Sequence, residues 1–324
     1  MFKNKKLILA LTLVVTFTLL AGVGCAPEGE EKEELEESHL EMEEVHFGYV
    51  QWPGVTVKTH VSRTILEELG YETSMEAYTQ QVLFEGMAQG DVDAFLGNWD
   101  PTMRVNFKPY QDDGDVVNVA RNLDQALYRT AVPEYVWEAG VKSMADLHEH
   151  KEKFDGEIIG LEPGNDGNQI ILDAIENDTY NLSDWELQTG NTAAMLAALD
   201  GATRDEEWIA FNGWEPHWMN VAYDIKYLED PEGIWGEDDT VYTVAPPELE
   251  EEASNFWKFL EQFEVTSDIQ SEYILEYQEK ERDPSEVAEE WVANNLDIVS
   301  KWVEGMVAKD GREATEVLKE AFAN

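Results

Sequence analysis

The chain has 324 residues, with 22 Lys and Arg against 69 Asp and Glu, so its formal net charge is −47. This charge excludes nucleic acid and anionic membrane surfaces as partners, because both would be repelled. The carboxylates are spread along the whole chain, which indicates a protein that works in high salt, where repulsion is strongly screened.

The start of the chain predicts targeting rather than fold. Residues 1–24 predict a signal peptide, because a short basic segment precedes an apolar run that carries no charge. Cys25 is the chain's single cysteine, so it has no partner for an internal disulfide, and its position suits a lipidation site. The preceding Gly22-Val23-Gly24 departs from the usual lipobox, so an uncleaved anchor or a plain signal peptide stays an alternative. Residues 25–44 predict an acidic tether with too few apolar side chains to fold.

From residue 45 onward, the hydrophobic pattern alternates between strands and helices joined by short loops. The expected strands are 45–50, 71–78 and 93–96, and the expected helices are 57–69 and 80–89. Gly70 and Gly90 stand where helix C-caps belong. The β-α-β-α-β order predicts a parallel sheet covered by helices.

A second block repeats this rhythm further along the chain. It predicts strands over 158–161 and 207–211 and helices over 169–176 and 191–200. From residue 249 the pattern changes to amphipathic helices, including one over 286–303, which we expect to pack around one lobe without site chemistry. Two α/β blocks predict two lobes with a ligand cleft beyond the carboxyl ends of their strands.

Three tryptophans follow the expected strands: Trp52, Trp99 and Trp214. Each is next to Pro or Gly or two residues from one, so each is expected at the rim of a sheet. Any one of them alone would more often be a loop anchor, but three in equivalent places favour a common site. Four other tryptophans are interpreted as core residues: Trp208, Trp257, Trp291 and Trp302.

Several indoles at one point suit a quaternary ammonium ion. Such a cation carries its charge on methyl groups and has no N–H to donate, so ordinary hydrogen bonds do not hold it. Aromatic ring faces attract it through cation–π interactions of about 0.5–2 kcal/mol per ring. The pattern therefore predicts an aromatic box.

Three segments carry a resemblance to a known family. Residues 97–103 (GNWDPTM), 160–165 (GLEPGN) and 213–219 (GWEPHWM) are similar to signature stretches of the glycine betaine/choline-binding proteins of ABC importers. The resemblance extends over about 45–303. It implies an α/β, two-lobed type II periplasmic-binding-protein fold with the ligand cleft between the lobes. The expected first lobe is 45–132 with 235–324, and the second is 133–234.

The resemblance also implies the residues of the site. Carried over position by position, the box consists of Trp52, Trp99, Tyr128 and Trp214. Asn165, in its Pro-Gly-Asn turn, is implied to reach the polar end of the ligand. The alternative for Asn165 is a turn residue that binds its own backbone.

Two departures from the family bear on the ligand. Choline-binding relatives have an aspartate two residues after the first box tryptophan, where this chain has Gly54. Five residues after Trp99, where some betaine-binding relatives have a histidine, the chain has Arg104, which suits a carboxylate. The alternative for Arg104 is a surface ion pair. Together these departures favour glycine betaine over choline.

The sequence thus predicts the extracytoplasmic binding protein of an ABC importer, lipid-anchored to the cell membrane and monomeric, which delivers glycine betaine to a permease. Choline, carnitine or proline betaine remain alternative ligands, and a secreted enzyme or a structural lipoprotein remain alternative classes. No catalytic motif, metal-ligand spacing or cofactor signature is present, so neither a metal nor a cofactor is expected.

Overall fold

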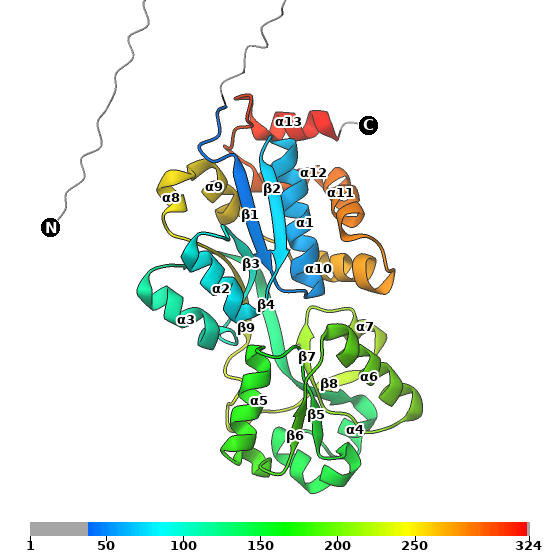
Figure 1. The fold of residues 1–324 in the computed structure, drawn as a ribbon. Helices are drawn as coiled ribbons and strands as arrows, with labels where there is room; N and C mark the ends of the chain where they lie inside the picture. The colour runs from blue at the N-terminus through cyan, green and yellow to red at the C-terminus, as the bar shows by residue number, and fades with distance from the viewer. Residues whose placement is uncertain (1–37, 323–324) are drawn as a thin grey trace, which may run out of the picture. The chain divides into compact units, whose positions relative to one another are not determined.

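In the computed structural model, which describes residues 38–322, the chain folds into two lobes (Figure 1). Each lobe has its own hydrophobic core. The predicted signal peptide, Cys25 and most of the acidic tether lie outside the described residues. Leu40 is buried in the first core and strand β1 (Glu44–Tyr49) begins at Glu44. The last residues of the predicted tether therefore belong to the fold.

The first lobe starts with alternating strands and helices. After β1 come α1 (Pro53–Glu68), β2 (Glu72–Ala77), α2 (Gln80–Gln89), β3 (Phe95–Asp100) and α3 (Arg104–Asp113). Strands β1 and β2 pair in parallel, and a parallel bridge between Phe47 and Ala94 leads toward β3. Strand β3 pairs antiparallel with β9 (Asp239–Ala245), so the sheet is mixed rather than purely parallel as predicted.

Element boundaries differ from the expected ones mainly at helix starts and strand ends. Helix α1 begins at Pro53 rather than at residue 57, because proline is well suited to the first helical position. Strand β3 runs through Trp99, and β7 (Phe211–Glu215) runs through Trp214. These two tryptophans are therefore the last-but-one residues of their strands and do not follow them.

Strand β4 (Val117–Pro133) is shared by the two lobes. Its first part pairs with β9, and its part from Leu127 onward pairs with β7 and β8 (Ile225–Tyr227). Ala126 packs in the first core and Tyr128 in the second, so the second core begins a few residues before the predicted boundary at 132/133. The chain returns to the first core between Trp235 and Val241.

The second lobe contains a small mixed sheet. In it, β5 pairs in parallel with β6 and β7, while β7 pairs antiparallel with β4. Its elements before β7 are α4 (Glu134–Glu138), η1 (Met144–Phe154), β5 (Glu157–Ile159), α5 (Asp166–Glu176), η2 (Thr179–Asn181), β6 (Glu186–Gln188) and α6 (Thr192–Asp205). After β7 comes α7 (Met219–Ala222). Asn165 and Asn191 cap α5 and α6 with their side chains.

The C-terminal helices pack on the first core, as predicted. They are α8 (Leu249–Glu252), α9 (Ser254–Gln262), α10 (Ser267–Ile274), the π-helical turn η3 (Leu275–Glu279), α11 (Pro284–Asn294), α12 (Leu296–Trp302) and α13 (Ala314–Ala321). The single helix expected over 286–303 is two helices, because Asn295 has a non-helical backbone (φ −128°, ψ 35°). Trp291 and Trp302 stack across this break at 5.6 Å between ring centroids.

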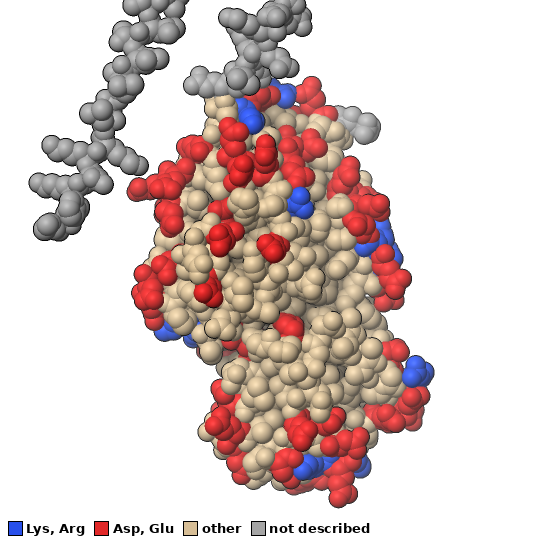
Figure 2. Space-filling view, in the orientation of Figure 1, with Lys and Arg blue, Asp and Glu red and all other residues tan. Residues whose placement is uncertain are grey.

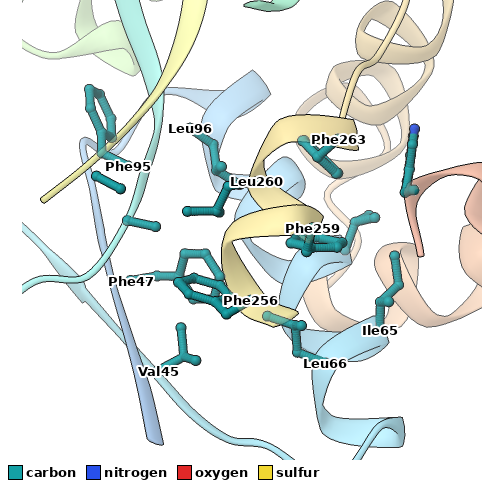
Figure 3. Close-up of a cluster of buried hydrophobic side chains, with 14 of the residues drawn as sticks. Val45, Phe47, Ile65, Leu66, Phe95, Leu96, Phe256, Phe259, Leu260 and Phe263 are labelled. Carbon is teal, nitrogen blue, oxygen red and sulfur yellow. The ribbon is translucent and has the colours of Figure 1, made fainter. Parts of the chain in front are cut away.

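Figure 3 shows how the first core closes between a helix and the strands. Phe256 of α9 packs against Phe47 of β1, with 6.2 Å between their ring centroids. Phe259 and Leu260 of α9 and Phe95 and Leu96 of β3 belong to the same core. Trp257, Trp291 and Trp302 are buried as predicted. Trp208 is only partly buried. It packs against the second core, and the ammonium group of Lys153 lies over its ring, 3.9 Å from the ring centroid. Acidic side chains are scattered over both ends of the face drawn in Figure 2, and few basic ones accompany them.

Candidate functional site

A mostly apolar pocket lies between the two cores and takes residues from both. It is lined by Trp52, Gly54, Val55, Gln80, Trp99, Thr102, Met103, Tyr128, Leu161, Asn165, Trp214 and Gln270. Five of the six predicted ligand-binding residues are in this set, and Arg104 is the exception. None of the lining residues carries a charge at neutral pH.

Trp52 enters the pocket from the point where β1 turns into α1. It is the N-cap residue of α1, and its carbonyl oxygen accepts hydrogen bonds from the backbone and hydroxyl of Thr56 at 2.9 and 2.8 Å. Its indole Nε1 donates to Oε1 of Glu162 in the second lobe at 3.0 Å. The ring is therefore fixed at its base by the helix and at its tip by the opposite lobe.

Trp99 and Trp214 occupy similar local settings in the two lobes. Each lies near the end of a strand and precedes an acidic residue and a cis proline, Asp100-Pro101 in one case and Glu215-Pro216 in the other. Trp214 is 7% exposed, and its ring lies 4.8 Å from that of His217. Burial lowers the pKa of His217 to about 3, so this ring stays neutral and positions the Trp214 loop.

Tyr128 contacts the rings of both Trp99 and Trp214. It lies opposite Trp214 in the pairing of β4 with β7, and the two ring centroids are 6.2 Å apart at an interplanar angle of 90°. On its other side, the ring of Trp99 is 6.4 Å away at 69°. Burial raises the pKa of Tyr128 well above its ordinary value, so its hydroxyl stays a neutral donor, and it donates to Oδ1 of Asn165 at 3.0 Å.

Asn165 makes hydrogen bonds that hold the wall of the pocket together. Its Oδ1 also accepts from the backbone N–H of Gly167 at 2.9 Å, which caps α5. Its Nδ2 donates to Glu162 Oε1 at 3.0 Å, the same oxygen that accepts from Trp52. The turn role that sequence reasoning kept as an alternative is therefore present, while the residue also lines the pocket.

Further hydrogen bonds join the lobes next to the pocket. Oε1 of Gln80 accepts from the backbone N–H of Asp166 at 2.9 Å, and Nδ2 of Asn106 donates to Oδ1 of Asp166, also at 2.9 Å. Oε1 of Gln278 in η3 accepts from Trp218 Nε1 at 2.9 Å and from His217 Nε2 at 3.1 Å. Together with Trp52–Glu162, these contacts are the interlobe hydrogen bonds discussed below.

Two buried carboxyl groups lie near this junction. Burial raises the pKa of Asp166 to about 7, against the opposing effect of the Asn106 hydrogen bond. Burial also raises the pKa of Asp239 to about 6, although Asp239 accepts from the backbone and hydroxyl of Thr102 at 2.9 and 2.8 Å. Asp166 alone of the two is bonded across the lobes, because Asp239 and Thr102 both belong to the first lobe.

Sequence reasoning assigned Arg104 to the carboxylate of the ligand. Its side chain is 57% exposed, and its guanidinium pairs with Asp100, the last residue of β3, at 2.7 Å. The two residues are four apart across the turn between β3 and α3, so this local pair forms easily in a chain rich in carboxylates. The surface ion pair, which was the alternative interpretation, is therefore what the structure contains, and Arg104 does not line the pocket.

Sequence reasoning missed Gln270 and Glu162. Gln270 comes from the C-terminal helices, where no site chemistry was expected. The missed signal is local: Gln270, Tyr273 and Ile274 share one buried face of α10, so a polar side chain stands on an apolar stripe. Glu162 was inside a quoted motif, but nothing local indicates that it would accept from Trp52. Within residues 38–322, no cluster of three or more His, Cys, Asp or Glu is placed to hold a metal ion.

The comparison that decides the family is a match over residues 43–294. This segment fits the family described as the substrate-binding domain of ABC-type glycine betaine transport systems. The chain belongs to this family. It is thus a substrate-binding protein of the glycine betaine/choline ABC transporter family, which acts outside the cytoplasm with an ABC permease.

Solved structures of related proteins confirm the predicted fold class. An ABC-transporter choline-binding protein in complex with choline has 34% sequence identity and a TM-score of 0.84, covering 86% of this chain and 98% of that one. Lactococcal OpuAC in its closed-liganded conformation with glycine betaine has 28% identity and a TM-score of 0.75, covering 81% of this chain and 100% of that one.

Two related proteins match parts of the chain. The glycine betaine/carnitine transport binding protein GbuC of Listeria monocytogenes is 35% identical over 164 residues, which is 50% of this chain and 54% of that protein. The match thus spans about half of GbuC. An uncharacterized protein, ORF1, of Chromohalobacter salexigens is 42% identical over 130 residues, covering 40% of this chain and 84% of that protein.

Proposed function

We propose that this protein captures glycine betaine, with the trimethylammonium group held by the aromatic box. The observation that carries the proposal is that Trp52, Trp99, Tyr128 and Trp214, contributed by both lobes, line one pocket. Ring faces attract a methylated cation without needing an N–H donor on it. Because both lobes contribute rings to the box, the affinity for the ligand also depends on whether the lobes are closed.

The uncharged lining of the pocket favours a zwitterion over a simple cation. Burying a net charge without a partner costs more than burying a neutral dipole whose ends are both accommodated. Glycine betaine has no net charge, and amide side chains in the lining provide neutral hydrogen-bond donors for its carboxylate. With Arg104 paired at the surface, these amide donors take the place of the guanidinium contact that the sequence predicted.

Choline is the second candidate. The choline-bound protein named above is similar over 86% of this chain, which supports a choline-sized site. Gly54 argues in the other direction, because the aspartate that choline-binding relatives place there is missing. Carnitine and proline betaine share the methylated cation and the carboxylate, and they belong to the same ligand class as glycine betaine.

For mechanism, we infer that the lobes close over the ligand. The interlobe hydrogen bonds form only when the lobes approach each other, so a ligand that fills the aromatic box would shift the population toward the closed form. The closed form then docks on the permease, and the ligand is released unchanged. The protein is in this account a receptor without catalysis.

We also propose that Cys25 is lipidated and anchors the protein as a monomer to the cell membrane. The support is the position of Cys25 directly after an apolar leader. Among residues 38–322, no helix is long and apolar enough to cross a membrane. Metabolic labelling with a fatty-acid probe, compared between the natural chain and Cys25→Ser, tests the anchor.

Isothermal titration with a panel of quaternary amines at high salt tests the ligand. We expect stoichiometric binding of glycine betaine, tighter than that of choline, with no product detected by NMR after prolonged incubation. Absence of binding to every quaternary amine would refute the proposed function. A clear preference for choline would keep the aromatic box but refute glycine betaine as the ligand.

A further inference from the structure

The amide of Gln80 is held in one orientation by the opposite lobe. Gln80 is the first residue of α2 in the first lobe, lines the pocket and is only 3% exposed. Its Oε1 accepts from the backbone N–H of Asp166, the first residue of α5 in the second lobe, at 2.9 Å. A backbone N–H only donates, so the atom that faces it must be the amide oxygen. The Nε2 group therefore occupies the other end of the amide.

This Nε2 group has two hydrogens to donate. Within residues 38–322 it donates to no protein acceptor, and the protein does not enclose it completely. Because Gln80 is otherwise buried and lines the pocket, these hydrogens face the pocket. Buried donors usually have a partner, and here the partner has to come from what the pocket holds. The partner must be an acceptor, such as a carboxylate oxygen.

The start of α2 adds to the suitability of this place for an anion. Thr79, the N-cap residue, makes no side-chain hydrogen bond to the helix, so the first turn keeps backbone N–H groups without a helical partner. Such a helix start carries a partial positive charge that favours a negative group. The carboxyl group of Asp166 accepts from Asn106 and does not line the pocket. The donors of Gln80 therefore reach a part of the pocket that suits negative charge.

We propose that Gln80 is a specificity-determining residue whose Nε2 donates to the carboxylate of a betaine when the lobes close. This assignment rests on the proposed function and makes it more specific. A hydrogen bond from an amide to a carboxylate is charge-assisted, so it is stronger than one to the hydroxyl of choline. Because Asp166 orients the amide from the opposite lobe, the donor is aimed only after closure. The closed form is thus the form that recognises the carboxylate.

The test is Gln80→Glu, which keeps the length of the side chain and an oxygen that accepts from Asp166. It replaces the donor by a carboxylate oxygen. At about pH 8 we expect the dissociation constant for glycine betaine to rise at least about tenfold, because two carboxylates would face each other. The constant for choline should stay the same or fall, since its hydroxyl can donate to the new carboxylate. Titration calorimetry measures both constants.

Gln81→Glu is the matched control. Gln81 is the next residue of α2, is exposed and does not line the pocket, so this variant places the same charge in the same helical turn. Salt screens an exposed charge, so neither constant should change by more than about twofold. An equal rise of the glycine betaine constant in both variants would show a general effect of charge at the start of α2, and it would overturn the role of the Gln80 amide.

A second variant guards against misfolding caused by a buried charge. Gln80→Met has a similar length but loses both the donor and the acceptor of the interlobe hydrogen bond. Both ligands should bind more weakly, and glycine betaine should lose severalfold more than choline. An unchanged ratio of the two dissociation constants in the folded variants would overturn the specificity role. Natural protein that binds no glycine betaine would instead refute the proposed function, so the two failures are distinguishable. Thermal unfolding of each variant checks the fold.

Discussion

The aromatic box and the interlobe hydrogen bonds surround the same pocket but differ in their chemistry. The box consists of large rings. Tyr128 and Trp214 are at most 8% exposed, and Tyr128 contacts both Trp99 and Trp214 edge to face. The interlobe hydrogen bonds are made by amides, two indole N–H groups, an imidazole and carboxylates, and each joins one lobe to the other.

This difference teaches how capture and closure can be separate properties of one site. Cation–π attraction depends on ring faces and is almost independent of pH, whereas a bonded carboxyl group responds to protonation. Removing a ring should therefore weaken every quaternary amine, and altering an interlobe hydrogen bond should change how readily the lobes close. The variants below separate the two.

Trp214→Ala should have the largest effect. It removes one ring face of the box and the edge-to-face contact with Tyr128, so we expect glycine betaine and choline each to bind more than about tenfold more weakly. Titration calorimetry measures the change. Trp208→Ala is the control, because Trp208 is a partly buried tryptophan of the same lobe that does not line the pocket. Unchanged affinity in Trp214→Ala would count heavily against the aromatic box.

Asp166 should make binding depend on pH. Burial raises its pKa to about 7 in the closed form, and in an open form, in which separated lobes would expose Asp166 to water, its pKa should return toward the ordinary aspartate value. Closing then takes up a proton, so closure is favoured at low pH and the advantage is lost as the pH rises through 7. We expect affinity to fall severalfold between about pH 5.5 and pH 8.

Calorimetry of Asp166→Asn over the same pH range checks this prediction. The variant should show a nearly flat profile, while Asp113→Asn, an exposed carboxylate on α3, should keep the dependence of the natural protein. Identical profiles for the natural protein and Asp166→Asn would remove Asp166 as the titrating group.

Trp52→Phe should have a smaller effect, because Trp52 belongs to both parts of the site. Phenylalanine keeps a ring face but loses the indole N–H that donates to Glu162. We expect a loss of about two- to fivefold, near the lower end of the net contribution of a single hydrogen bond, with faster ligand dissociation in stopped-flow measurements. In a double-mutant cycle with Glu162→Gln the two changes should not be additive. Full additivity would show that the bond does not contribute to closure.

Arg104→Ala should have no effect on binding. Its guanidinium is exposed and paired with Asp100 outside the pocket, and exposed pairs contribute little. Titration should give the same ratio of betaine to choline affinity as in the natural protein. A selective loss of glycine betaine would restore the carboxylate role that the sequence predicted for this residue.

Much of the fold follows from local patterns. Helix α2 lies at 80–89 and ends at left-handed Gly90, as predicted, because a helical repeat and a C-cap glycine are both local signals. The strand-end tryptophans were also visible in the sequence, and the resemblance to a family added Tyr128. The ends of β3 and β7 were placed too early, because their pairing with β9 and β4 extends them through the tryptophans.

The sequence by itself determined the two α/β lobes, the helices packed on the first core and the aromatic residues of the box, since periodicity and short motifs encode these. Only the tertiary structure decided that Gln270 reaches the pocket, that Glu162 accepts a hydrogen bond from Trp52, and that Arg104 forms an ion pair with Asp100. The physical reason is distance along the chain. Gln270 meets Gly54, and Glu162 meets Trp52, only after the two cores have packed, and no local pattern records which side chains then become neighbours.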